Sequence, residues 1–179
     1  MRKKVLKSVL IALMTAIFTV CAQLAIPIGG VPMTLQTFAA ALCGYILGIY
    51  SIMAIFIYLL LGAVGLPVFA GFGASFAFLF GPTGGFLFGF LFLGAFCALA
   101  SHMKSHIKAI LISLIGLIIC HVLGVLWFGF VSGNGILPSF LLTSLPYLLK
   151  DILSLIFAWI LTQKLRQRYP NLLLLRHTS

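Results

Sequence analysis

Long runs of apolar residues are the feature that most constrains how this chain can fold. Hydrophobic residues occupy 63% of the 179 positions and charged residues only 7%, and the mean hydropathy is +1.29. A domain that faces water on all sides cannot carry this composition, so the surrounding solvent is expected to be lipid. Each membrane-crossing helix takes roughly 20 apolar residues. The sequence therefore predicts an all-α integral membrane protein with about six transmembrane helices.

Proline and glycine clusters divide the apolar sequence into these expected spans. The predicted spans are residues 8–26, 34–47, 49–65, 84–100, 109–131 and 146–164. Residues 66–85 are too apolar for a solvated loop, and we expect them to fold back against the helices and line a binding site. The segment from Pro138 to Pro146 is compatible with a short helix over the outer face. Together these elements form one membrane domain over residues 1–179.

The positive charges indicate how the chain is oriented. Eleven Lys and Arg against one acid give a formal charge of 11 − 1 = +10. Ten of the eleven lie in the N-terminal residues 1–7, in the loop with Lys104 and Lys108, and from Lys164 through the tail 166–179, and the eleventh is Lys150. Cytoplasmic loops carry the excess of Lys and Arg, so both termini are predicted to be cytoplasmic in a multi-pass protein of the cell membrane. This distribution marks topology and not a nucleic-acid surface.

Several kinds of chemistry lack the residues that they need. The four cysteines are scattered singly without metal-ligand spacing, so no metal site is expected. Gly81-Pro82-Thr83-Gly84-Gly85 lacks the Lys that ends a phosphate-binding loop, and a single acid offers no magnesium ligand pair. No nucleotide site, cofactor or catalytic residue is therefore predicted. His121 stands alone in its span and is interpreted as a satisfied core histidine.

Asp151, the only acid in the sequence, is the first candidate for ligand binding. A charge inside a membrane helix costs about 2.5–3.5 kcal/mol on insertion scales, so it normally faces a cavity or a partner. Neighbouring helical side chains point about 100° apart, so we expect Lys150 and Asp151 to pair poorly, leaving Lys150 for a ligand carboxylate. The alternative is an interfacial pair in which Lys150 reaches water and Asp151 caps backbone.

Two further positions have open alternatives. Thr34 and Gln36 follow the first span, where a ligand arriving from outside would enter, but they could simply cap the next helix. Ala12 and Ala16 form a small-xxx-small pair that could serve internal packing or docking to another membrane subunit.

Three ordered motifs resemble the BioY family, the biotin-binding S components of energy-coupling factor (ECF) transporters. They are Ile26-Pro27-Ile28-Gly29-Gly30-Val31-Pro32-Met33-Thr34-Leu35-Gln36-Thr37, the stretch from Tyr58 to Gly71 that reads YLLLGAVGLPVFAG, and Gly81-Pro82-Thr83-Gly84-Gly85-Phe86. The resemblance covers nearly the whole chain and implies the six-helix fold of this family.

The resemblance also implies a function and partners. Such a subunit captures biotin from outside and delivers it with an ATP-driven module made of a transmembrane coupling protein and two ATPases. Ala12 and Ala16 match the family's docking face on the first helix. Biotin would lie among the first loop, the loop before the fourth span and the start of the last span. The corresponding residues are Asp151, Lys150, Thr34, Gln36, Gly71, Phe72, Gly84 and Phe86.

The sequence departs from the family pattern near the acid. A lysine usually stands three residues after it, where this chain has Ser154, while Lys150 precedes it. This leaves open an S component for another small carboxylic acid, such as a lipoate-like compound. An intramembrane enzyme or a purely structural membrane protein has less support, because no catalytic pair is present.

Overall fold

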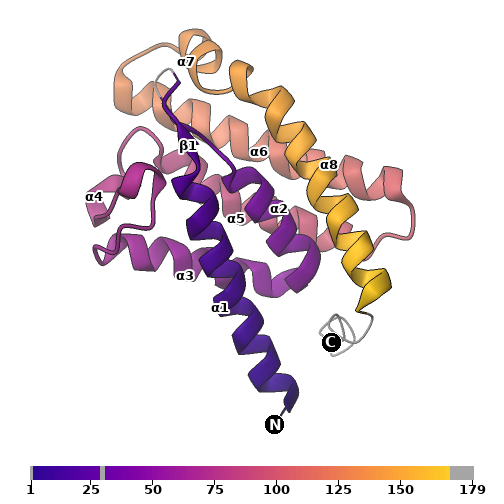
Figure 1. Cartoon of the computed structure of the whole chain (residues 1–179). Helices are drawn as coiled ribbons and strands as arrows, with labels where there is room; N and C mark the ends of the chain where they lie inside the picture. The colour runs from indigo at the N-terminus through magenta and orange to yellow at the C-terminus, as the bar shows by residue number, and fades with distance from the viewer. Residues whose placement is uncertain (1, 29–30, 170–179) are drawn as a thin grey trace.

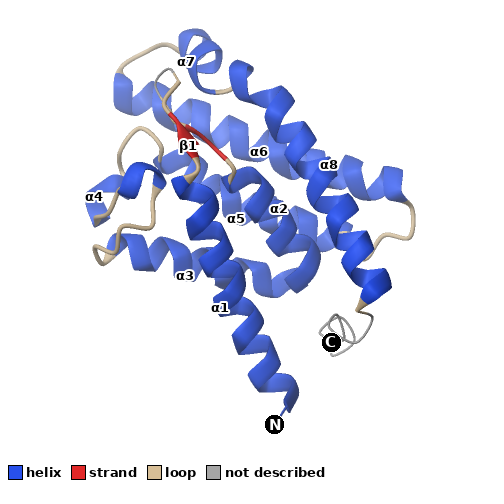
Figure 2. Ribbon diagram, viewed as in Figure 1, coloured by secondary structure: helices blue, strands red, loops and turns tan. Residues whose placement is uncertain are grey.

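Helices form nearly all of the structure, a computed structural model that describes residues 2–28 and 31–169 (Figure 1). The helices are α1 (Arg2–Gln23), α2 (Gln36–Leu47), α3 (Ser51–Ala63), α4 (Phe76–Leu79), α5 (Gly84–Ala100), α6 (His106–Ser132), α7 (Ile136–Thr143) and α8 (Leu145–Arg168). The strands β1 (Ala25–Ile26) and β2 (Met33–Thr34) pair antiparallel between α1 and α2 (Figure 2). This strand pair was not predicted, and it shapes the loop that follows the first helix.

Four segments of the described chain are long and apolar enough to cross a membrane. They are Lys4–Gln23, Gln36–Ala63, His106–Ser132 and Leu145–Arg168. α5 is a shorter apolar helix of 17 residues. The predicted all-helical fold with several membrane-crossing candidates is confirmed.

The second of these segments is bent, as the sequence predicted near Gly48. Gly48 has φ +58°, a left-handed value that glycine adopts without the steric cost of a Cβ atom, and it opens the 3₁₀ turn Gly48–Tyr50. After the bend the two halves have different neighbours, because α2 packs against α5 and α8 whereas α3 packs mainly against α1 and α5. The bend thus lets one apolar segment pack against two different sets of helices.

Three helices are longer than predicted. α1 begins at Arg2 and not at residue 8, so residues 2–7 are helical, and it ends at Gln23, before the strand β1. α6 begins at His106 and not at Ala109, because the Ser105 side chain caps its first turn by accepting a hydrogen bond from the Lys108 amide. α8 continues past Lys164 to Arg168, and the Arg166 guanidinium donates to the carbonyl oxygens of Tyr45 and Ser101. Within the predicted tail 166–179, residues 166–168 are therefore helical, and residues 170–179 lie outside the described part of the chain.

The segment 66–85 folds back against the helices, as predicted. It contains the 3₁₀ turn Ala70–Phe72 (η2) and α4. Phe69 is fully buried and stacks on Phe78 at a ring distance of 5.0 Å. The Trp127 indole of α6 donates to the Gly81 carbonyl over 3.0 Å. These contacts fix the segment over one end of α5 and α6. The predicted short helix between α6 and α8 is α7.

Close approach of α5 and α6 brings two site residues together. A Cβ atom added at Gly89 would lie 2.7 Å from the Cys120 sulfur, and one added at Gly85 would lie 2.5 Å from the Leu123 carbonyl oxygen. Only residues without a side chain allow these helix backbones to approach so closely. As a result, Phe86 of α5 lies against His121 of α6, with ring centroids 5.9 Å apart.

Candidate functional site

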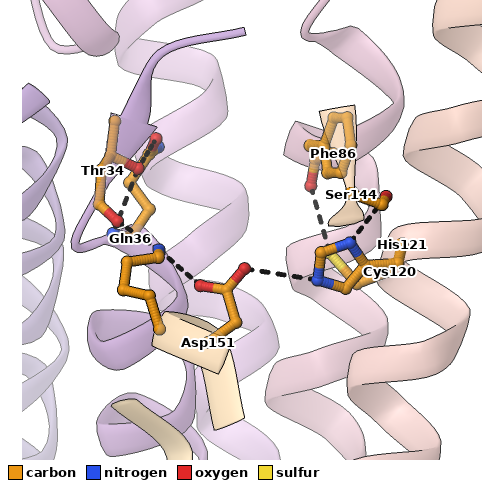
Figure 3. A network of polar contacts seen from close by, with 8 residues as sticks. Thr34, Gln36, Phe86, Cys120, His121, Ser144 and Asp151 are labelled. Atoms are coloured by element: carbon orange, nitrogen blue, oxygen red, sulfur yellow. Dashed lines mark hydrogen bonds and ion pairs between the residues drawn. The ribbon is translucent and has the colours of Figure 1, made fainter. Parts of the chain in front are cut away.

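Asp151 lies at the centre of a buried polar cluster. The residue is only 4% exposed. One carboxylate oxygen, Oδ1, forms an ion pair with the Lys150 ammonium group, and the other, Oδ2, lies 3.3 Å from His121 Nε2. Figure 3 shows the carboxylate facing the His121 ring, with a dashed line between them. A buried acid needs such partners, because an isolated charge in an apolar interior is strongly disfavoured.

The ion pair corrects the prediction that Lys150 and Asp151 would pair poorly. Their Cβ atoms do point in different directions around α8, but the lysine side chain has four methylene groups and can bend back over its neighbour. Its ammonium group also donates a 2.6 Å hydrogen bond to the Thr34 carbonyl. The angle between positions 150 and 151 around α8 therefore does not prevent the ion pair, because the long lysine side chain can reach back to the carboxylate.

His121 belongs to the cluster, although the sequence interpretation left it out. Its Nδ1 atom lies 2.8 Å from the Ser144 hydroxyl at the start of α8. A neutral imidazole with its proton on Nε2 donates to Asp151 and accepts from Ser144, so both ring nitrogens have partners. His121 is satisfied, as expected, but it is not alone. The signal that could have identified it is an ionisable residue deep inside a predicted span.

Thr34 and Gln36 connect the first loop to the helices. The Thr34 hydroxyl donates to Gln36 Oε1 over 2.9 Å, and Gln36 Nε2 donates to the Tyr58 hydroxyl over 2.9 Å. The backbone amide of Gln36 also donates a hydrogen bond to the Thr34 hydroxyl over 3.3 Å. The Thr34 hydroxyl thus accepts a hydrogen bond from the first residue of α2, although the N-cap of this helix is Leu35 and has no side-chain cap. Both Thr34 and Gln36 remain beside the cavity.

Side chains of α8 hold this first loop in place. The Tyr147 hydroxyl lies 2.5 Å from the Ile28 carbonyl and 2.6 Å from the Val31 carbonyl, so it donates to one of them at a time. Lys150 bonds the Thr34 carbonyl one turn further along α8. The loop is therefore anchored to the helix that carries the acid.

A cavity of about 50 Å³ lies among these groups. Its lining includes five predicted site residues, Thr34, Gln36, Phe86, Lys150 and Asp151. Thr37 of the first-loop motif also lines it, as do Ala70 and Thr83 of the segment 66–85 that was expected to line a site. The sequence did not single out Phe90, Cys120, His121 and Tyr147, which line it as well. Small-molecule sites usually span roughly 300–1,000 Å³. The structure therefore represents a closed form, and a ligand has to displace side chains or the first loop to enter.

Three predicted ligand residues do not line this cavity. Phe72 is 70% exposed and Gly71 is exposed beside it, while their neighbour Ala70 is in the lining. Gly84 is buried against the preceding turn, where an added Cβ atom would lie 2.0 Å from the Leu79 carbonyl oxygen. These glycines shape the segment around the cavity, and their contact with a ligand stays a prediction.

The position of the missing lysine also lies outside the cavity. Ser154 borders a separate apolar groove on the surface of α8, together with Leu153 and Phe157. Lys150 borders both the groove and the cavity. A cation at position 150 therefore reaches the cavity in this structure, whereas the side chain at position 154 does not.

Other candidates lie apart from this cluster. Ala12 and Ala16 are exposed on α1. Within residues 2–28 and 31–169, no group of three or more His, Cys, Asp or Glu side chains could hold a metal ion.

Comparison with known proteins places the chain in a family. The model of the BioY family matches residues 1–171. The chain is 38% identical over 159 residues to a probable biotin transporter BioY of Pyrococcus horikoshii, covering 88% of this chain and 94% of the relative. It is 39% identical over 156 residues to the biotin transporter BioY of Thermotoga maritima, covering 86% and 91%. It is 45% identical over 126 residues to the biotin transporter BioY2 of Lactococcus lactis, 69% of each chain.

A solved structure agrees with these sequence relatives. The fold matches a crystal structure of the S-component for biotin from an ECF-type ABC transporter, with a TM-score of 0.84, 27% identity and 93% coverage of both chains.

The Tyr147 contacts predict how firmly the first loop is held. Tyr147→Phe removes one hydrogen bond, worth about 1 kcal/mol, so amide hydrogen exchange of residues 31–34 should rise about fivefold. Exchange followed by mass spectrometry measures this. The matched control is Tyr50→Phe, which removes a hydroxyl bonded to Lys7 and should leave exchange in residues 31–34 unchanged. Equal exchange in the wild type and Tyr147→Phe would show that the hydroxyl does not hold the loop.

Proposed function

This chain belongs to the BioY family, and we propose that it is the substrate-binding membrane subunit that captures biotin and delivers it across the membrane with an ATP-driven ECF module. The observation that carries this proposal is the cavity built around Asp151, because it combines a buried carboxylate with an apolar wall and polar groups of the first loop.

The polar groups suit the chemistry of biotin. The ureide ring of biotin offers two N–H donors, which a carboxylate such as Asp151 accepts, and a carbonyl oxygen that needs a donor. Gln36 and Thr34 carry such donors at the loop side of the cavity. The aromatic ring of Phe86 supplies an apolar wall for the fused rings. Lys150 is the proposed partner of the biotin carboxylate, in place of the lysine that the family carries at the position of Ser154.

Three residues complete the proposed site around the cavity. Gly71, Phe72 and Gly84 belong to the segment between α3 and α5, and this segment would have to adjust when a ligand widens the cavity. We propose that they contribute to the bound form. Their support is the family motif and the proximity of Ala70 and Thr83, which line the cavity directly.

The same family assignment supports a topology of six spans with both termini in the cytoplasm. In this arrangement α2 and α3 cross separately on either side of the bend at Gly48, and α5 is the fourth span. Lys104 and Lys108 then face the cytoplasm, and the α6–α7 connection lies outside. The proposed location is the cell membrane. No catalytic step is proposed for any residue.

The proposed partners are a transmembrane coupling protein and two ATPase subunits. Ala12 and Ala16 are exposed on one face of α1, near the exposed Val9 and Val20. Small side chains let another helix approach closely. This face is the proposed docking surface for the coupling protein.

Replacing the acid tests the ligand site. Asp151→Asn leaves the Lys150 ammonium without its anionic partner and weakens the hydrogen bonds to the ureide, so biotin affinity should fall about tenfold to a hundredfold. Binding of radiolabelled biotin to the purified protein measures this. Gln167→Ala, on an exposed face of the same helix, should bind as the wild type does. Unchanged affinity in Asp151→Asn would remove the acid from the site. If an excess of unlabelled lipoate displaced the label better than unlabelled biotin, the ligand assignment would be wrong.

Cysteine labelling tests the orientation. The four native cysteines are free and buried, so an introduced cysteine should dominate labelling. Asn134→Cys should react with a membrane-impermeant maleimide in intact cells, and Lys104→Cys only after the membrane is permeabilised. The reverse pattern would overturn the proposed topology.

A bulky residue on α1 tests the docking face. Ala16→Trp should reduce ATP-dependent biotin uptake at least about tenfold while biotin binding to the isolated subunit stays unchanged, because the indole prevents close helix contact. Ile118→Trp, at an exposed position of α6, is the matched control and should transport normally. Normal uptake in Ala16→Trp would place the docking surface elsewhere.

A further inference from the structure

Three ionisable side chains determine the charge beside the cavity. Lys150 is positive and Asp151 is negative, and the two form an ion pair. His121 is bonded in a way that a neutral imidazole satisfies, with Asp151 at Nε2 and Ser144 at Nδ1. The closed site therefore carries no net charge when His121 is neutral.

A ligand with a carboxylate group changes this balance. Binding it inside the cavity gives the site a net charge of −1, and the surrounding apolar walls screen that charge poorly. The Lys150 ammonium cannot neutralise both Asp151 and a ligand carboxylate. The sequence has no other acid, and among the residues that the structure describes the bases that reach Asp151 are Lys150 and His121. His121 is thus the group able to supply a second positive charge.

The surroundings of His121 permit a second proton. The Ser144 hydroxyl faces Nδ1 and can rotate from donor to acceptor, so protonation of Nδ1 need not break that hydrogen bond. Nε2 keeps its proton and its contact with Asp151. Besides Asp151, the titratable groups near His121 are Lys150 and Tyr147 of α8 and Cys120 of α6. From α5, the Phe86 ring packs edge-on against the His121 ring.

We propose that His121 takes up a proton when the cavity binds an anionic ligand, so that the site acquires its second positive charge only in the bound state. This inference rests on the proposed biotin-binding function. An N–H bond forms at the imidazole Nδ1 as a hydronium ion or the acid form of the buffer gives up its proton, and no other bond changes. The Ser144 hydroxyl and the Asp151 carboxylate hold the imidazolium on its two sides.

Proton uptake makes affinity depend on pH with a definite sign. The bound state holds more protons than the free state, so affinity for biotin should be highest at low pH and should fall as pH rises. The fall is at most about tenfold per pH unit, which corresponds to one proton. Biotin methyl ester, which is uncharged, should show nearly constant affinity.

Calorimetry tests the proposal on the purified full-length protein. Binding of biotin is measured between pH 5.5 and 8 in two buffers of different ionisation enthalpy, which reports the number of protons taken up. The wild type should take up as much as one proton with biotin and almost none with biotin methyl ester. His121→Gln keeps a donor toward Asp151 but does not titrate, so it should bind biotin without proton uptake. The matched control is His106→Gln on the same helix, and it should behave as the wild type does.

Two results would contradict the proposed proton uptake by His121. Proton uptake that persists in His121→Gln would assign the proton to another group, and equal uptake with biotin and its methyl ester would show that ligand charge is not the cause. Either result overturns the proposal. If His121→Gln does not fold, His121→Asn and the comparison of the two ligands on the wild type still decide it. Absence of biotin binding at every pH would instead reject the proposed function.

Discussion

The burial of one acid between two bases is the constraint on which the candidate site depends. Asp151 is 4% exposed, and it can remain there as a carboxylate only because Lys150 and His121 reach its two oxygens. His121 comes from α6 and the other two residues from α8, so the contact between His121 and Asp151 also joins two of the long helices. Removing either base would leave a buried charge short of a partner, which is costly in an apolar interior.

The same group of residues connects the acid to the loop that covers it. Lys150 contacts Asp151 and also donates to the Thr34 carbonyl, and Tyr147 donates to the loop one turn earlier. A ligand that attracts the Lys150 ammonium would compete with the Thr34 carbonyl for it. Ligand binding and loop position are thereby linked through one side chain, which suits a cavity that is too small for a ligand in its closed form.

Glycine packing determines where the polar groups meet. Gly85 and Gly89 let α5 approach α6 closely, which places Phe86 beside His121. The segment between α3 and α5 then covers this end of the helices, with Phe69 buried and Trp127 bonded to Gly81. The apolar wall beside His121 is a consequence of this contact between α5 and α6.

The sequence by itself determined the class of the protein and the identity of its acid. Apolar composition predicts membrane helices whatever the tertiary packing, because lipid replaces water as the solvent. Proline and glycine clusters marked several helix ends for local steric reasons, including the start of α5, and Gly48 marked the separation of α2 from α3. The motifs that resemble the BioY family named Thr34, Gln36, Phe86 and Asp151, all of which line the cavity.

Only the tertiary structure decided which side chains meet Asp151. His121 is 30 positions away in the chain, and no local pattern places it beside the acid; packing of α6 against α8 does. The Lys150 contact was misjudged from helix geometry, because a flexible side chain can reach where its Cβ does not point. Gly71 and Gly84 belong to the family motifs and Phe72 directly follows one of them, but none of the three lines the cavity. A motif records which segments come together, whereas the folded backbone decides which of their side chains face inward.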